Sequence, residues 1–357
     1  MAMHSLTLFL PGLLGPMPAF AALPAGELPD LSCLENLLGR AEHHAAAVAP
    51  GVEAGLFSLF DIPPAPDADP PVAAVTRLLD GGEPDARWWL RADPVYLQAD
   101  TDSAVLLAHD ELRLTPAEAA QLAGEIQAVF GEDGWQLQAL HPARWYLTLP
   151  AAPRLRTHAL GEVLGRNVRP FLPAGEDGRL WHRHLNEIQM LLHASAVNAE
   201  REASGRLPVN SLWFWGGGTL PPKPAGRRSS WAGVWADEPL AQGLAALSGA
   251  TFSALPSDGQ DWLRGESVPG EHLLYVDDLR APAASADPFE WVGALEAVQA
   301  RWLVPLHRAL QTGRLAELVL LAGDGGCYRV RRGGRWRSWL PRRWRHRPLS
   351  AYLGDRA

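Results

Sequence analysis

The stretch from Asn198 to Gly218 constrains the fold more than any other part of the chain. Its apolar run 209–215 (Val-Asn-Ser-Leu-Trp-Phe-Trp) ends abruptly in three glycines, residues 216–218. Such a run is typical of a strand buried on both faces, and the glycines suit a loop that bends sharply or approaches a ligand. Because ligands of open α/β sheets bind beyond the carboxyl ends of the strands, we expect the functional site here. The alternative is a core strand followed by a tight turn.

Short apolar runs alternate with segments of helical spacing along most of the chain. This alternation is typical of an α/β fold with a mostly parallel sheet. The expected strands are 5–10, 212–215, 232–235, 273–276 and 318–322, and the expected helices are 34–48, 72–79, 185–203, 240–247 and 289–310.

One segment with a different order of expected strands and helices interrupts this alternation. Residues 90–150 read as two strands, a helix and two further strands. Thr115, with Glu118 three residues later, forms a capping-box pattern that begins the helix. We therefore expect an inserted α+β subdomain at residues 89–180, within a discontinuous core made of residues 1–88 and 181–357.

Composition places the chain among globular proteins. Its 357 residues are 47% hydrophobic and 20% charged, and the formal net charge of -8 does not suggest general nucleic-acid binding. Cys33 and Cys327 stand far apart, which argues against a zinc ribbon and fits a reducing compartment. We expect a cytoplasmic protein without a membrane contact, in which residues 1–22 form a core strand and a glycine loop rather than a signal peptide.

Asn198 and Arg201 are the candidate anion-binding groups. On a helix they share one face, and the planar fork of arginine fits a phosphate or a carboxylate. The alternative is a surface pair at a helix end. The sequence contains no GxSxG elbow, no GxxxxGK[ST] loop and no GxGxxG turn. This argues against an ordinary α/β-hydrolase, a P-loop nucleotidase and a Rossmann dinucleotide site.

The segment 329–347 is strongly basic and carries Trp336, Trp339 and Trp344. Basic and aromatic residues together are typical of surfaces that bind single-stranded nucleic acid. The segment could equally dock on an acidic face of the same chain, and we do not expect nucleic acid to be the main partner.

Residues 193–218 resemble a known signature. They read His-x4-Asn-x2-Arg and then Val-Asn-Ser-Leu-Trp-Phe-Trp-Gly-Gly-Gly. This is similar to the signature of the archaeal-type cofactor-independent phosphoglycerate mutases, members of the alkaline phosphatase superfamily. Residues 89–95 and 186–193 carry a closer resemblance, to bacterial phosphoglycerate mutase-like or RpfE-type regulatory proteins. The resemblance implies an alkaline phosphatase-like three-layer α/β core, with a mostly parallel sheet and an inserted small α+β subdomain.

The chain departs from the family at the positions that carry catalysis. Pro11 and Gly12 stand where the family has a metal-binding aspartate after the first strand. The family's serine nucleophile corresponds to Val52, and valine has no nucleophilic oxygen. The family's Asp-x-x-Gly-His run has become residues 277–281, without a histidine.

Further metal ligands of the family are also missing. Its Asp-His pair after the last strand has become Asp324 and Gly325, and its next histidine falls near residues 335–337, which are arginine and tryptophan. Asp277, Asp278 and Asp324 are at most remnants of a metal site, so we expect neither a metal nor another cofactor.

We therefore predict a catalytically degenerate phosphoglycerate mutase-like protein with a regulatory role or a role in binding a metabolite or partner. Its expected ligand is a phosphorylated or carboxylated metabolite, and a protein partner is also expected. The expected ligand-binding residues are Asn198, Arg201, Asn210, Trp213, Trp215, Gly216, Gly217 and Gly218. Two alternatives stay open: an active phosphomutase or phosphohydrolase with rearranged ligands for Mn or Zn, and a nucleic-acid-associated factor that uses the basic C-terminal segment.

Overall fold

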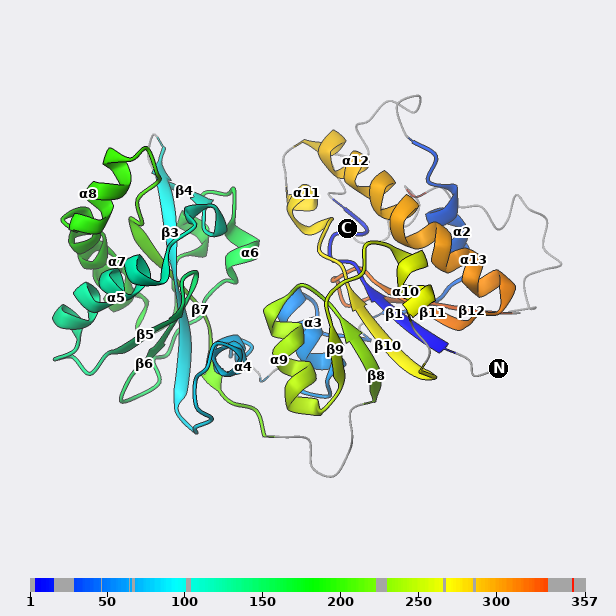
Figure 1. The fold of residues 1–357 in the computed structure, drawn as a ribbon, viewed down its shortest axis with the longest axis horizontal. Helices are drawn as coiled ribbons and strands as arrows, with labels where there is room; N and C mark the ends of the chain where they lie inside the picture. The colour runs from blue at the N-terminus through cyan, green and yellow to red at the C-terminus, as the bar shows by residue number, and fades with distance from the viewer. Residues whose placement is uncertain are drawn as a thin grey trace. The chain divides into compact units, whose positions relative to one another are not determined.

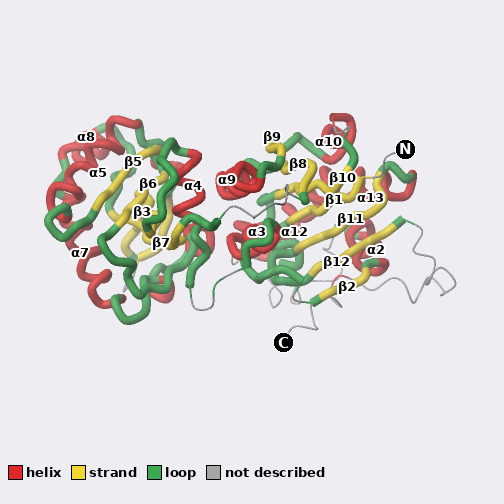
Figure 2. The backbone as a smooth tube through the Cα atoms, turned by 90° about the horizontal axis from the view of Figure 1, so that it is seen from below, coloured by secondary structure: helices red, strands yellow, loops and turns green. Residues whose placement is uncertain are grey.

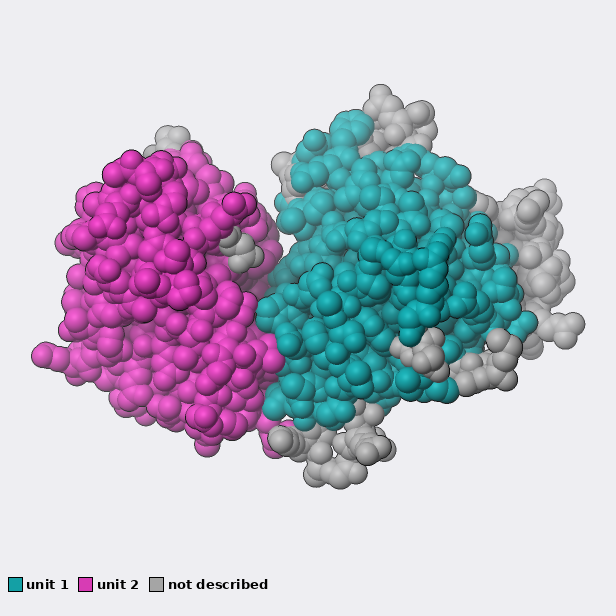
Figure 3. Space-filling model, viewed as in Figure 1, with its two compact units in different colours: residues 1–63, 223–357 teal, residues 64–222 magenta. Residues whose placement is uncertain are grey.

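The computed structural model describes residues 4–15, 29–45, 47–63, 65, 68–100, 104–222, 230–265, 268–284, 287–332 and 349. The chain forms two compact units (Figure 3): unit 1 contains residues 1–63 and 223–357, and unit 2 contains residues 64–222. Unit 2 is therefore one uninterrupted piece of chain inserted into unit 1.

Unit 1 is built on a seven-stranded sheet in the order β2-β12-β11-β1-β10-β8-β9, which Figure 2 shows strand by strand. The strands are β1 (His4–Phe9), β2 (Glu42–His44), β8 (Trp231–Trp235), β9 (Thr251–Ser253), β10 (Gly270–Tyr275), β11 (Leu315–Leu321) and β12 (Cys327–Arg331). Strands β11, β1, β10, β8 and β9 are parallel, whereas β12 and β2 are antiparallel at one edge. The predicted mostly parallel α/β sheet is confirmed.

Helices lie on both faces of this sheet (Figure 1). They are α2 (Ser32–Arg40), α3 (Val52–Leu59), α9 (Pro239–Ser248), α10 (Gly259–Gly265), α11 (Arg280–Ala284), α12 (Pro288–Val298), a π-helical segment η3 (Gln299–Leu303) and α13 (Val304–Thr312). Alternate residues of β1 separate the faces: Leu6 and Leu8 join the core formed with α2, α10, α12 and α13. Phe9 packs instead on Gly55 of α3.

Unit 2 combines antiparallel strands with helices. Its strands are β3 (Trp88–Ala99), β4 (Ala104–Ala108), β5 (Gln136–His141), β6 (Arg144–Thr148) and β7 (Ser211–Thr219). Its helices are α4 (Val72–Leu79), η1 (Asp110–Leu112), α5 (Pro116–Phe130), α6 (Leu160–Val163), η2 (Arg169–Phe171), α7 (Gly178–His193) and α8 (Ala196–Ala203). The sheet order is β4-β3-β6-β5, with β7 also paired to β3. The capping box at Thr115 and Glu118 is present and begins α5 as predicted.

The strand predicted at 212–215 lies in a different sheet from the expected one. It belongs to β7, which pairs antiparallel with β3 in unit 2, and not to the parallel sheet of unit 1. Burial on both faces shows that a strand is internal, but it does not show which sheet contains the strand. The compact units accordingly divide at residues 64 and 222, whereas the expected subdomain was 89–180.

The helix predicted at 34–48 is too long. Helix α2 ends at Arg40, and the chain continues as the exposed strand β2, which pairs with β12. The single helix predicted at 289–310 is present as the run α12, η3 and α13. In the described parts of the chain, no helix combines the length and the apolar character that a membrane span needs.

Candidate functional site

Loops that follow four parallel strands meet at the carboxyl edge of the unit 1 sheet. The start of α3 is tied to this edge, because the Gly51 amide donates to the Gly323 carbonyl at 2.8 Å. Gly51 has a φ of 90°, a conformation that favours glycine. Ligands of parallel α/β sheets bind at this edge, so we treat it as the candidate functional site.

An ion pair at this edge joins the first turn of α3 to the start of α11. Arg280 Nη2 donates to Glu53 Oε1 at 3.0 Å, and the two side chains are only 17% and 12% exposed. Glu53 lies in the first turn of α3, and Arg280 begins α11 just after β10. The pair therefore holds a guanidinium among the loops where a ligand would be expected.

The charge of the same guanidinium acts on two further carboxylates, those of Glu238 and Asp277. Burial raises the pKa of Glu238 and the carboxylates of Glu53 and Asp277 raise it further, while a hydrogen bond from the Leu240 amide and the charge of Arg280 partly offset this. Burial also raises the pKa of Asp277 against the opposing charge of Arg280. Asp277 is nevertheless exposed at the surface, where solvent screens its interactions. Burial lowers the pKa of Arg280, but Glu53 and other neighbours more than offset this and leave it raised.

Of the three possible metal remnants, only Asp277 belongs to this cluster. Asp278 accepts a hydrogen bond from Arg301 Nη1 at 2.7 Å. Asp324 Oδ1 accepts from the amide of Gly326 at 2.9 Å, as in a local turn.

Pro11, Gly12 and Val52 occupy the positions at the end of β1 and the start of α3 that the resemblance assigns to a metal ligand and a nucleophile. After Pro11, the Gly12 amide donates to the Ala322 carbonyl at 3.2 Å, and the Gly12 carbonyl accepts from Trp291 Nε1 at 2.8 Å. Val52 begins α3 with its side chain buried. These positions therefore serve packing and backbone hydrogen bonding.

The residues at this edge do not fit the two-metal centre that the resemblance implies. Such a centre needs several aspartate and histidine ligands and an oriented nucleophile. Among the residues that the structure describes, no three or more His, Cys, Asp or Glu side chains are grouped so as to hold a metal ion. The Glu53 carboxylate instead pairs with the Arg280 guanidinium.

The residues predicted to bind a ligand lie in unit 2, and several of them form hydrogen bonds within the chain. Asn198 Nδ2 donates to the carbonyls of Leu192 and Val209, and its Oδ1 accepts from the Val209 amide. Arg201 is fully buried and donates to the carbonyls of Leu112 and Leu207. It also donates to the Glu118 carboxylate at 3.1 Å. Both side chains thus tie α8 to neighbouring backbone.

Asn210 and Trp213 are also engaged by backbone groups. The Asn210 side-chain amide accepts from the Leu97 amide and donates to the Leu97 carbonyl, both at 2.8 Å, and so extends the β3–β7 ladder by one rung. Trp213 Nε1 donates to the His158 carbonyl at 2.8 Å.

The three glycines allow close packing in unit 2. A Cβ atom on Gly216, Gly217 or Gly218 would lie 2.9, 2.4 or 2.5 Å from Val72, Trp88 or Pro71, respectively. The predicted loop is wrong, because these glycines continue strand β7 as far as Thr219, and their close contacts are made to the chain's own side chains. Ligand binding at these residues stays a prediction.

A buried charge network in unit 2 was missed by sequence reasoning. Arg91 donates through Nε and Nη2 to Asp93 at 2.9 and 2.8 Å, and Asp93 is completely buried. Trp215, a predicted ligand residue, donates from Nε1 to Asp93 Oδ2 at 2.7 Å. Arginine and aspartate two residues apart on a strand share a face, which was the available signal.

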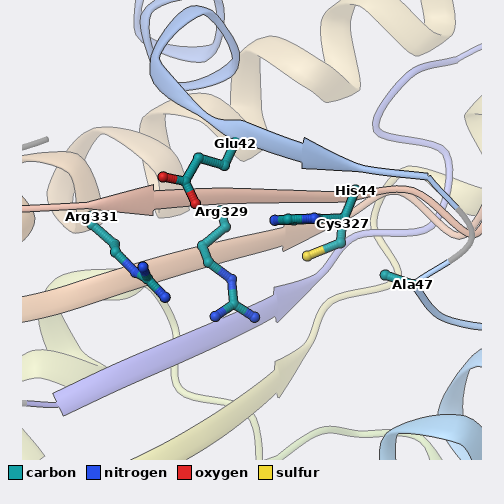
Figure 4. Close-up of a pocket in the computed structure, with 6 residues that line it drawn as sticks. All are labelled: Glu42, His44, Ala47, Cys327, Arg329 and Arg331. Atoms are coloured by element: carbon teal, nitrogen blue, oxygen red, sulfur yellow. The ribbon is translucent and has the colours of Figure 1, made fainter. Parts of the chain in front are cut away.

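A surface pocket of about 340 Å³ opens over β2 and β12 (Figure 4). It is lined by Glu42, His44, Ala47, Cys327, Arg329 and Arg331. Its two arginines both pair with Glu317, at 3.2 and 2.6 Å, so they share one carboxylate of the chain. The rest of the predicted basic segment, from residue 333 to 347, lies outside the described residues.

Comparison with known proteins identifies sequence relatives of one kind. The chain is 24% identical over 294 residues to a probable 2,3-bisphosphoglycerate-independent phosphoglycerate mutase of Geobacter sulfurreducens, covering 80% of this chain and 67% of the relative. It is 25% identical over 180 residues to a 2,3-bisphosphoglycerate-independent phosphoglycerate mutase of Methanothrix thermoacetophila, covering 46% and 45%. No protein-family model matches the chain.

The fold is also found among solved structures. The PH0037 protein of Pyrococcus horikoshii aligns with a TM-score of 0.54 and 13% identity, covering 93% of this chain and 88% of that one. The structural similarity concerns the fold alone, and the sequence relatives supply the family. Together with the mostly parallel α/β core, these similarities identify the chain as a phosphoglycerate mutase-like protein of the alkaline phosphatase superfamily.

Proposed function

We propose that this chain is a catalytically degenerate phosphoglycerate mutase-like protein with a regulatory role, exerted by binding a phosphorylated or carboxylated metabolite or a protein partner. The observation that carries the proposal is the Arg280–Glu53 ion pair at the carboxyl edge, directly beside the buried Val52. A phosphoryl-transfer site of this family type needs a nucleophilic oxygen and bound cations at these positions. The chain has an apolar side chain and an internal salt bridge there instead.

A turnover experiment tests the proposal. The full chain is incubated with 2-phosphoglycerate, 3-phosphoglycerate or para-nitrophenyl phosphate, with Mn²⁺ or Zn²⁺ added and, in parallel, with a chelator. We expect no isomerisation and no phosphate release in any sample. Turnover that needs metal and stops on chelation would instead establish the active-enzyme alternative.

Ligand binding is measured on the same preparation. A metabolite that binds the folded chain raises its unfolding temperature in a concentration-dependent way. We expect stabilisation by a phosphorylated or carboxylated three-carbon acid and none by glycerol, which lacks the anionic groups. Stabilisation without turnover supports the binding role.

A further inference from the structure

The pocket over β2 and β12 is built on one face of the unit 1 sheet. Alternate side chains of a strand lie on opposite faces of its sheet. Tyr328 and Val330 of β12 belong to the apolar core that β1 forms with α2, α12 and α13. Cys327, Arg329 and Arg331 therefore lie on the other face, where they line the pocket (Figure 4).

The short strand β2 completes the pocket. His44 lies directly opposite Cys327 in the ladder, and Glu42 lies opposite Arg329. Residues that face each other across two strands share one face of the sheet. Beyond β2, the Ala47 amide donates at 2.9 Å to a carbonyl of the loop between β11 and β12, which fixes that end of the pocket. A volume of about 340 Å³ is at the lower end of the range of about 300–1,000 Å³ for small-molecule sites, so the pocket fits a small metabolite.

The two guanidinium groups keep donors for a ligand. Arg329 pairs with Glu317 through Nη1 at 3.2 Å, and Arg331 pairs with the same carboxylate through Nε at 2.6 Å. A guanidinium carries five N–H donors in a planar fork, so each arginine uses only one nitrogen on Glu317. The side chains are 36% and 55% exposed, so solvent or a ligand reaches them.

The charges that line the pocket favour a carboxylate over a phosphate. Glu317 raises the pKa of Arg331, and the charge of Glu42 raises it further, so two carboxylates act where the two guanidinium groups lie. Burial raises the pKa of the Cys327 thiol, although Arg329 partly offsets this, so the thiol adds no negative charge at neutral pH. A phosphate dianion would bring two negative charges close to Glu42. A carboxylate brings one, and its two oxygens match the fork of an arginine.

The residues predicted to bind a ligand in unit 2 are engaged differently. Asn198 and Arg201 donate to backbone carbonyls of their own unit, and Arg201 is fully buried. The arginines of the pocket are accessible instead, and they bind only a side chain.

We infer that the pocket over β2 and β12 binds the carboxylate of a small organic acid, and that Arg329 and Arg331 hold its two oxygens. This inference rests on the proposed binding role, and it adds the site and the class of ligand to that role.

The test is calorimetric titration of the full chain with three probes of similar size. Glycerate has a carboxylate, glycerol 3-phosphate has a phosphate, and glycerol has neither. Wild type is compared with Arg329→Gln and Arg331→Gln. Arg264→Gln is the matched control, because Arg264 is an exposed arginine of unit 1 that pairs with Asp261 in α10, away from the pocket residues. We expect wild type and the control to bind one glycerate per chain, and each pocket variant to bind it at least roughly tenfold more weakly.

A further variant tests the choice of carboxylate over phosphate. Glu42→Gln removes one negative charge from the lining of the pocket. We expect it to bind glycerol 3-phosphate roughly twofold or more tightly than wild type does, because the repulsion of the dianion is reduced. Near-ultraviolet circular dichroism without ligand checks that each variant is folded, and loss of an exposed ion pair should leave it so.

Three results would overturn the inference: no glycerate binding by wild type, equal binding by wild type and both folded pocket variants, or tighter binding of glycerol 3-phosphate than of glycerate by wild type. Phosphoglycerate turnover in the same preparations separates the two proposals. Glycerate binding that the pocket variants leave unchanged defeats this inference alone, because the binding role then lies elsewhere on the chain. Metal-dependent turnover by wild type defeats the proposed function, whatever the pocket binds.

Discussion

Replacing Asp93 by asparagine tests whether the buried charge network holds unit 2 together. Asp93 accepts two hydrogen bonds from Arg91, one from the Trp145 amide and one from the Trp215 indole. Asp93→Asn keeps the shape but removes the negative charge. Arg91 is then left buried with one amide oxygen in place of the carboxylate, the Thr76 hydroxyl at 3.4 Å, and the rings of Tyr146 and Trp215 near its charge.

Loss of one partner from a buried ion pair costs about 3–5 kcal/mol, because the remaining charge is uncompensated. For a unit of this size, that corresponds to a fall in melting temperature of roughly 6–20 °C. The measurement is urea unfolding, with hydrogen exchange of peptides from β3, β6 and β7 to assign the loss to unit 2. Glu176→Gln is the control: Glu176 pairs with Arg154 at the surface, where both side chains are mostly exposed.

A loss below about 1 kcal/mol, no larger than that expected for an exposed pair, would show that the network does not carry this stability. A second variant separates charge from packing. Replacing Arg91 and Asp93 together by apolar residues of similar size should recover much of the loss, since well-packed apolar groups often match a buried ion pair in stability.

Three further perturbations address unit 2. Thr115→Ala removes the hydroxyl that accepts from the Glu118 amide at 3.2 Å; thermal unfolding should show a loss of about 0.5–2 kcal/mol, and an unchanged midpoint would count against the cap. Arg201→Lys cannot reproduce the donors that reach two backbone carbonyls, so urea unfolding should show a loss of about 2 kcal/mol, whereas wild-type stability would favour a ligand role. Burial raises the pKa of Asp80, but hydrogen bonds from Arg144 and Tyr146 more than offset this and leave the pKa lowered. The stabilisation of the fold by the Asp80 carboxylate is therefore complete above the unfolded pKa of about 3.9, and it is lost as the pH falls through the lower folded pKa. Urea midpoints measured across this acid range should therefore fall more steeply for wild type than for Asp80→Asn.

Local signals in the sequence were sufficient for several elements. The start of α5 was predicted correctly because both halves of the capping box, Thr115 and Glu118, lie within one helical turn. The first strand and the long helical run 288–312 also followed from their hydrophobic periodicity. The exchange of helix for strand at His43 and His44 was missed, because β2 is stabilised by pairing with β12, which is distant in sequence.

The candidate site was less accessible to sequence reasoning. The run 212–215 was correctly seen as buried, but its partner β3 could be assigned only from pairing. Asn198 and Arg201 carry the donors that an anion needs, and the sequence does not reveal that carbonyls of the same chain take them up. Glu53 and Glu238 were not singled out, since only the fold brings them to Asp277 and Arg280.

The insertion of unit 2 as one continuous piece has a consequence for synthesis on the ribosome. Residues 64–222 emerge together, so all strands and helices of unit 2 are available before the later part of unit 1 has been translated. Strand β1 emerges first but must wait for its neighbours, since Gly270–Tyr275 and Leu315–Leu321 are translated much later. Domains fold as units during translation, so unit 2 should fold before unit 1, although the first strand of unit 1 is translated before unit 2. The apolar β1 would stay unpaired on the nascent chain throughout, and chaperone binding is expected at this strand.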